Sequence, residues 1–202
     1  MCGRYWIDSE PEGELAEIIA CMQRLELPDG RSPAKLSGEI FPGDSVPVIC
    51  RSRNGKIMSY PMEWGFHSAD GRRIINARSE TAREKPMFRQ SMTDRRCLVP
   101  MSAYFEWQTR GREKIRHRII PEESGLCCLA GLYRFEGDRP VFTVLTRDAA
   151  PEISFIHDRM PVILPYADRE EWLSGCDMDA PSALHMHSDE MDDGPRQLML
   201  EI

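Results

Sequence analysis

The sequence contains no apolar run near the ~18 residues that a membrane-spanning helix requires. It also has no basic segment followed by an apolar one near its start, which is the pattern of a secretory signal. These two absences predict a cytoplasmic protein without a membrane partner.

No C-x-x-C pair occurs among the cysteines, whose odd number, seven, also argues against a disulfide framework. Reduced thiols in the cytosol are the simplest interpretation. His185 and His187 lie in an acidic tail rather than in a metal-ligand pattern, so we expect no metal and no cofactor.

The chain has no overall excess of basic residues; its formal net charge is −7. Residues 71–118, however, carry thirteen Lys and Arg against five Asp and Glu, whereas residues 167–202 carry two against ten. Such segregation can produce a basic face on an acidic protein. A solvated surface of mixed charge remains the alternative.

Regular β-α-β alternation is missing, which argues against a doubly wound parallel sheet. Many short strand-like runs between residues 46 and 164, with few helical segments, predict an α+β fold. Its core would be a mixed, largely antiparallel, barrel-like or bent sheet with peripheral helices. Ser9 and Glu12 have capping-box spacing before an apolar stripe, so a helix is expected there. We expect one domain over residues 1–202, with an acidic surface loop at about 176–195 and a last strand at 197–202.

The first stretch that could carry chemistry is MCGRYW. Removal of Met1 would leave a thiol and a free α-amine on Cys2, with unperturbed pKa values near ~8.5 and ~7.7–8.0. If residues 2–4 are extended, the Arg4 side chain shares a face with the thiol and favours thiolate. An ordinary buried cysteine is the alternative.

RRIINARSET places Asn76 and Arg78 on one face of an extended segment, and Arg73 begins the same stretch. An amide beside a guanidinium suits an oxyanion or phosphate, although a solvated edge strand would look the same. In MSAYFEWQ, Glu106 lies between two aromatic residues, and partial desolvation would raise its pKa into the range of general acid–base work. A structural ion pair is the alternative for Glu106. In FIHDRMPVIL, His157 supplies an imidazole that could take part in catalysis, and a structural role is the alternative.

MCGRY, IINARSET, RRCLVPMSAYFEW and IHDRMPVIL, in this order and spacing, closely resemble the SOS response-associated peptidase family. The better-studied members of that family are abasic-site processing proteins. The resemblance covers essentially the whole chain. It implies a protein, expected to be a monomer, that binds single-stranded DNA containing abasic sites in the DNA damage (SOS) response and associates with the nucleoid when bound.

The resemblance implies that Cys2, once Met1 is removed, captures the aldehyde of the open sugar as a thiazolidine crosslink. Asn76 would lie beside the deoxyribose, Glu106 would move protons during closure and reversal, and His157 would assist Schiff-base chemistry. Arg78 and Arg4 would bind flanking phosphates. Peptidase activity toward Met1, and lyase-type or crosslink-reversal activity, are also implied.

Two departures from the family pattern stand out. GEIFPGD has Glu39 where many members have Asn, and WGFHSADGRR lacks the Trp-rich insertion that wedges between bases. Base stacking would then fall to Trp64, Phe66 or Trp107, with Arg73 in the basic track.

Three other functions remain open at this stage. Glutamine amidotransferases with an N-terminal nucleophile also begin Met-Cys-Gly and use the α-amine as base. A protease using Cys2 and His157 is the second, and a non-catalytic single-stranded-DNA-binding module the third.

Overall fold

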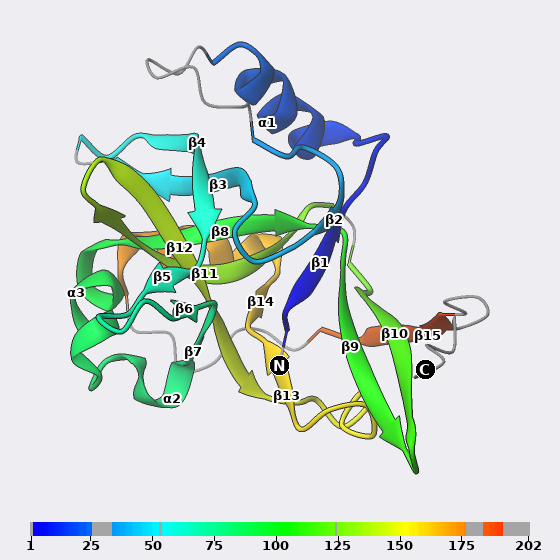
Figure 1. Cartoon of the computed structure of the whole chain (residues 1–202). Coiled ribbons are helices and arrows are strands. Elements are labelled where there is room, and N and C mark those ends of the chain that lie inside the picture. The colour runs from blue at the N-terminus through cyan, green and yellow to red at the C-terminus, as the bar shows by residue number, and fades with distance from the viewer. Residues whose placement is uncertain (1, 26–33, 53, 124, 177–183, 192–202) are drawn as a thin grey trace, which may run out of the picture.

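The computed structural model describes residues 2–25, 34–52, 54–123, 125–176 and 184–191 (Figure 1). Its helical elements are α1 (Gly13–Gln23), α2 (Ser79–Ala82), α3 (Pro86–Asp94), η1 (Tyr166–Asp168) and α4 (Arg169–Ser174). Its strands are β1 (Arg4–Ile7), β2 (Gly38–Ile40), β3 (Ser45–Arg51), β4 (Ile57–Trp64), β5 (Phe66–His67), β6 (Arg73–Ile74), β7 (Asn76–Arg78), β8 (Arg96–Met101), β9 (Ala103–Arg110), β10 (Glu113–Pro121), β11 (Cys127–Glu136), β12 (Arg139–Asp148), β13 (Arg159–Pro161), β14 (Ile163–Leu164) and β15 (Met186–Met191).

A closed five-stranded barrel forms the centre of the fold. The strands follow the order β12-β4-β3-β8-β11, and β12 pairs again with β11 to close the ring. β12 is parallel to β4 and to β7, while the other pairings in this sheet are antiparallel. The predicted α+β class with a largely antiparallel, barrel-like core is confirmed.

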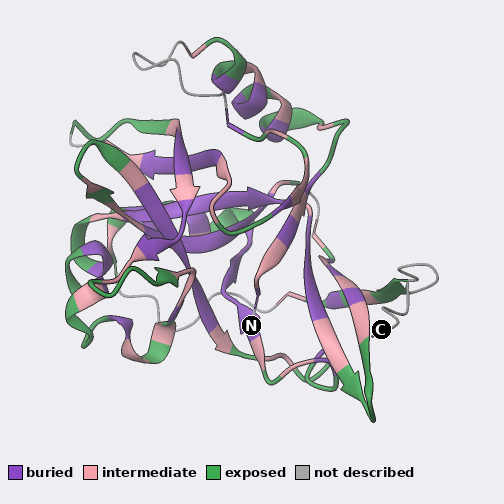
Figure 2. Cartoon of the chain, viewed as in Figure 1, coloured by how far each residue is buried: buried purple, intermediate pink, exposed green. Residues whose placement is uncertain are grey.

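Alternation along the barrel strands separates two apolar layers. Leu98 and Val141 belong to the cluster that includes Phe88 of α3 and Trp172 of α4, whereas Val99 and Phe142 belong to the other cluster. Because successive residues of a strand point to opposite faces, the second cluster fills the barrel interior and the first lies beneath the helices. Figure 2 shows the barrel strands as largely buried.

A second sheet has the order β15-β10-β9-β1-β2. Its β9–β10 hairpin extends away from the barrel, and the N-terminus lies between the two sheets (Figure 1). β1 therefore carries the first residues of the chain toward the barrel.

The structure corrects several expected elements. Met186–Met191, expected within a surface loop, forms β15, because its backbone pairs with β10 over six residues. α1 begins at Gly13, with Glu12 as its N-cap residue. No side chain caps this end of the helix, so the capping box expected from Ser9 and Glu12 does not form. Residues 151–156 form turns. The expected strand at 197–202 lies outside the described residues.

The apolar stripe of α1 is confirmed, since Leu15, Ile18, Ile19 and Met22 are buried. Among the residues that the structure describes, no helix is long and apolar enough to cross a membrane.

Candidate active site

Cys2 lies immediately before β1 and is completely buried. Its thiol is 3.7 Å from the Arg4 carbonyl oxygen, and its own carbonyl oxygen accepts a 2.8 Å hydrogen bond from Asn76 Nδ2 on β7. Burial raises the pKa of the Cys2 thiol well above its usual range, and the negative charge of Glu106 raises it further. The sulfur is therefore held as a thiol.

This arrangement corrects the expectation that the Arg4 side chain favours thiolate. β1 begins only at Arg4, so strand alternation does not extend back to Cys2. The Arg4 guanidinium instead lies 4.8 Å from the centroid of Phe41 and 5.0 Å from that of Trp107. The hydrogen bond between the sulfur and Arg4 is made by the backbone carbonyl oxygen of Arg4 and not by its guanidinium group.

Glu106 comes from β9 and is 4% exposed. Burial raises the pKa of its carboxyl group, and the nearby His157 imidazole opposes that rise. Charge interactions thus link Glu106 with both Cys2 and His157. This position fits the sequence-based expectation of a desolvated carboxyl group with a raised pKa.

His157 follows the turns at 151–156 and precedes β13. Its Nδ1 accepts a 2.9 Å hydrogen bond from the backbone N–H of Arg159, and it also lies 2.6 Å from Asp158 Oδ1. One nitrogen cannot accept and donate at once. Without a proton Nδ1 accepts from Arg159, and with a proton it donates to Asp158, so this atom has a partner in either case.

Sequence reasoning missed two residues that line this region. Tyr5 is fully buried, and the pKa of its hydroxyl is raised by burial and then by Cys2. Its hydroxyl and that of Tyr104 have no hydrogen-bond partner among the described residues. His117 is 2% exposed and lies directly opposite Glu106 across the β9–β10 hairpin, which only the hairpin register could have revealed.

The expected DNA-binding residues divide into two groups. Arg78 is exposed, and within the described ranges no hydrogen bond or ion pair of its side chain is found. Arg73 is held by Glu63 Oε1 at 2.6 Å and by the Trp64 carbonyl oxygen at 3.0 Å. Its side chain packs over Gly65. Arg73 therefore connects β6 to β4, and its guanidinium group is already paired with a carboxylate.

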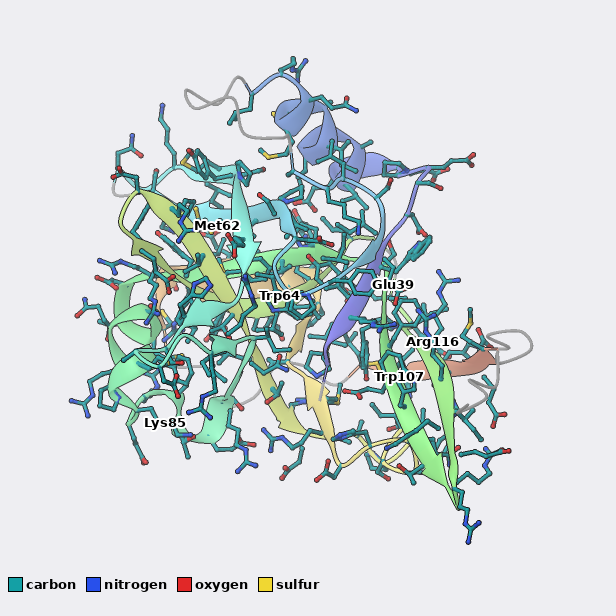
Figure 3. All side chains as sticks on the ribbon, in the orientation of Figure 1. Glu39, Met62, Trp64, Lys85, Trp107 and Arg116 are labelled. Atoms are coloured by element: carbon teal, nitrogen blue, oxygen red, sulfur yellow. The ribbon has the colours of Figure 1, made fainter. Side chains whose placement is uncertain are left out.

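The expectation that Trp64 or Phe66 stacks on bases is wrong, because both side chains are completely buried. Trp64 donates from Nε1 to the Ile75 carbonyl oxygen at 3.0 Å, and its ring stacks on Phe142 with centroids 6.2 Å apart. Trp64 lies in the middle of the fold in Figure 3. Trp107 is half-buried and remains a candidate.

No cluster of three or more metal-binding side chains occurs within the ranges that the structure describes. His187 Nε2 lies 2.9 Å from Asp189 Oδ1, and His185 Nδ1 lies 3.6 Å from Glu152 Oε1. Independently of this, a thiol, a carboxyl group and an imidazole are side chains that serve nucleophilic and acid–base chemistry, and Cys2, Glu106 and His157 supply one of each.

Comparison with known proteins identifies the family of this chain. The family model described as "SOS response associated peptidase (SRAP)" matches residues 1–196. The chain is 33% identical over 186 residues to the abasic site processing protein YoqW of Bacillus subtilis, covering 86% of this chain and 80% of that protein. It is 28% identical over 179 residues to the abasic site processing protein YedK of Escherichia coli, covering 86% and 79%.

Solved structures agree on the fold. An X-ray structure of a protein from Bacteroides thetaiotaomicron has a TM-score of 0.74 at 22% identity, covering 95% of this chain and 93% of that one. The chain therefore belongs to the SOS response-associated peptidase family.

Proposed function

We propose that this protein processes abasic sites in single-stranded DNA by forming a covalent crosslink through Cys2 after Met1 is removed. The observation that carries the proposal is the meeting of four groups from separate parts of the chain. The Cys2 carbonyl oxygen is hydrogen-bonded to Asn76 of β7, and charge interactions link Glu106 of β9 with both Cys2 and His157.

The proposed reaction uses both nucleophiles of an N-terminal cysteine. The unprotonated α-amine attacks the aldehyde carbon of the ring-opened sugar, and loss of one water gives an imine. The thiol sulfur then adds to the same carbon while its proton passes to the nitrogen, which closes a five-membered thiazolidine. An α-amine titrates near ~7.7–8.0, so it is far more available at neutral pH than a lysine amine at ~10.4.

The residues around Cys2 have distinct proposed roles. Asn76 holds the Cys2 carbonyl group and so fixes the direction of the α-amine and thiol. Glu106, with its raised pKa, exchanges protons with the sulfur and nitrogen during ring closure and reversal. His157, whose Nδ1 has a partner with or without a proton, would assist imine formation and hydrolysis. Lyase-type activity and removal of Met1 by the protein itself are further parts of this proposal.

DNA would approach along Arg78 on one side and along Arg4 and Trp107 on the other. Arg78 follows Asn76 by two residues on β7 and shares its face, so a phosphate bound there lies next to the site. Trp64 and Phe66 are left out because they are buried, and Arg73 because its cation is occupied.

The raised pKa of Cys2 disfavours the protease alternative. Cysteine proteases attack with a thiolate whose pKa is lowered, whereas burial and Glu106 act in the opposite direction here. Imine capture begins with the amine and accepts a neutral thiol in its second step. The amidotransferase alternative needs a thiolate as well and would leave Arg78 and Glu106 without a role.

The test is a denaturing gel. The purified protein, with Met1 loss verified by mass, is mixed with a single-stranded oligonucleotide containing one abasic site. We expect a shifted band that survives heat and detergent, and its absence in Cys2→Ala. Cys21→Ala is the matched control, because Cys21 is an exposed cysteine on α1. An unshifted band from protein lacking Met1 would exclude crosslinking, and ammonia release from glutamine would favour the amidotransferase.

A further inference from the structure

The face of β9 opposite Glu106 carries a strip of alternating cations and aromatic rings. Its members, which we call the outer strip, are Lys35, Phe41, Arg4, Trp107, Arg116 and Phe105. Each successive cation lies 4.0–5.8 Å from a ring centroid. Figure 3 shows Trp107 and Arg116 close together beside β9 and β10.

The register of the sheet builds this strip. Arg4 lies opposite Phe105, and Arg116 lies opposite Trp107, so these four side chains share one face of three neighbouring strands. The exposed part is formed by Phe41, which is 38% exposed, and by the Arg4 and Lys35 side chains, which are each 40% exposed. Phe105 is buried beneath Arg116 and supports the strip from below.

One carboxylate oxygen joins the two guanidinium groups of the strip. Glu39 Oε1 lies 3.3 Å from Arg4 Nη1 and 2.8 Å from Arg116 Nη2. Glu39 comes from β2, and its side chain is 21% exposed, so solvent reaches this ion pair. The position of Glu39 Oε1 between two cations is one that a phosphate oxygen would also occupy.

We propose that the outer strip binds the nucleotides next to the lesion, and that Glu39 competes with a DNA phosphate for Arg4 and Arg116. This inference rests on the proposed function. Single-stranded DNA fits the strip because its bases stack on aromatic rings and its phosphates pair with arginines. Glu39 lowers the affinity for DNA by occupying both cations and by repelling the phosphate.

Whether removal of the Glu39 charge strengthens or weakens DNA binding distinguishes competition with phosphate from a structural role of Glu39. If Glu39 competes, its removal takes away the carboxylate that Arg4 and Arg116 share, so a phosphate meets less competition for both guanidinium groups and binding strengthens. If Glu39 instead holds Arg4 and Arg116 in a productive position, its removal weakens binding. Glu39→Gln keeps the size of the side chain and removes only the charge.

The test measures binding of an undamaged single-stranded oligonucleotide over a series of salt concentrations. We expect Glu39→Gln to bind about two- to fivefold more tightly, the range of one exposed ion pair. The slope of log affinity against log salt should steepen by ~0.7, corresponding to one more neutralised phosphate. Glu170→Gln is the matched control, because Glu170 is an exposed carboxylate paired with Arg51 and the same charge is removed.

A second comparison places the effect on the strip. In an Arg116→Gln background, Glu39→Gln should produce a smaller gain, because one of the two guanidinium groups is missing. Equal or weaker binding by Glu39→Gln overturns the inference, as does the same gain in Glu170→Gln. If Glu39→Gln binds DNA more tightly but the protein forms no crosslink, only the proposed function is overturned. If the protein forms the crosslink but Glu39→Gln does not bind DNA more tightly, only this inference is overturned.

Discussion

Replacement of Glu106 by Gln is expected to stabilise the folded protein at neutral pH while slowing crosslink formation. Glu106 is 4% exposed, and burial raises its pKa in the folded state. The folded state therefore binds this proton more tightly than the unfolded state does. Stability is lost as pH rises from the unfolded pKa, ~4.3, to the raised folded value, and the loss is complete above it.

The magnitude follows from the size of the pKa shift. Each unit by which the pKa is raised costs about 1.4 kcal/mol of unfolding free energy at neutral pH. For a chain of this size, 1 kcal/mol corresponds to about 2–4 °C in melting temperature. Gln cannot ionise, so Glu106→Gln should melt several degrees higher at pH 7 and at the same temperature as the wild type near pH 4. The rate of crosslinking should fall by ~10²- to 10⁴-fold.

The assay combines thermal melts from pH 4 to pH 8 with the rate of crosslinking at pH 7. Glu113→Gln is the control, because Glu113 is exposed at the start of β10 and should change neither quantity. A Glu106→Gln protein that melts lower than the wild type at pH 7 would refute the desolvation argument. An unchanged crosslinking rate would refute the proton-transfer role.

Three further predictions concern Asn76, Arg78 and Gly65. Asn76→Ala removes the hydrogen bond to the Cys2 carbonyl, worth about 1–3 kcal/mol, so crosslinking should slow by ~5- to 150-fold with DNA affinity unchanged; a loss of affinity would contradict this. Arg78→Gln should weaken binding of single-stranded DNA and reduce the salt slope by ~0.7, whereas an equal effect of Arg24→Gln, at the C-cap of α1, would show a general charge effect. Gly65→Ala should lower the melting temperature by several degrees, because Gly65 has φ 122° and a Cβ there would lie 2.3 Å from Arg73 Cγ; an unchanged melt would contradict the packing of Arg73 over Gly65.

Local patterns predicted much of the fold. Short strand-like runs marked the barrel strands within a few residues at each end, because strands that are buried on both faces, as β8 is, consist mostly of apolar residues. Closure of the barrel by β12 could not be predicted, since it depends on contacts between distant segments. β15 was missed because its exposed, acidic residues lack apolar alternation; it exists through pairing with β10.

The candidate site was also predicted in part. Cys2, Asn76, Glu106 and His157 stood out as polar residues within apolar or strand-like runs, and the structure places them together. The error on Arg4 arose because strand alternation was extended two residues beyond the start of β1. The error on Trp64 arose because this residue was chosen to take the place of the missing Trp-rich insertion, whereas its ring lies in the barrel interior.

Mass spectrometry of the digested crosslink tests the central claim most directly. The account predicts a linked peptide that begins with Cys2, lacks Met1, and has the mass of peptide plus nucleotide remnant minus one water. It also predicts that reduction by borohydride is not needed to preserve the bond. A linkage at a lysine, or a crosslinked peptide that retains Met1, would contradict it.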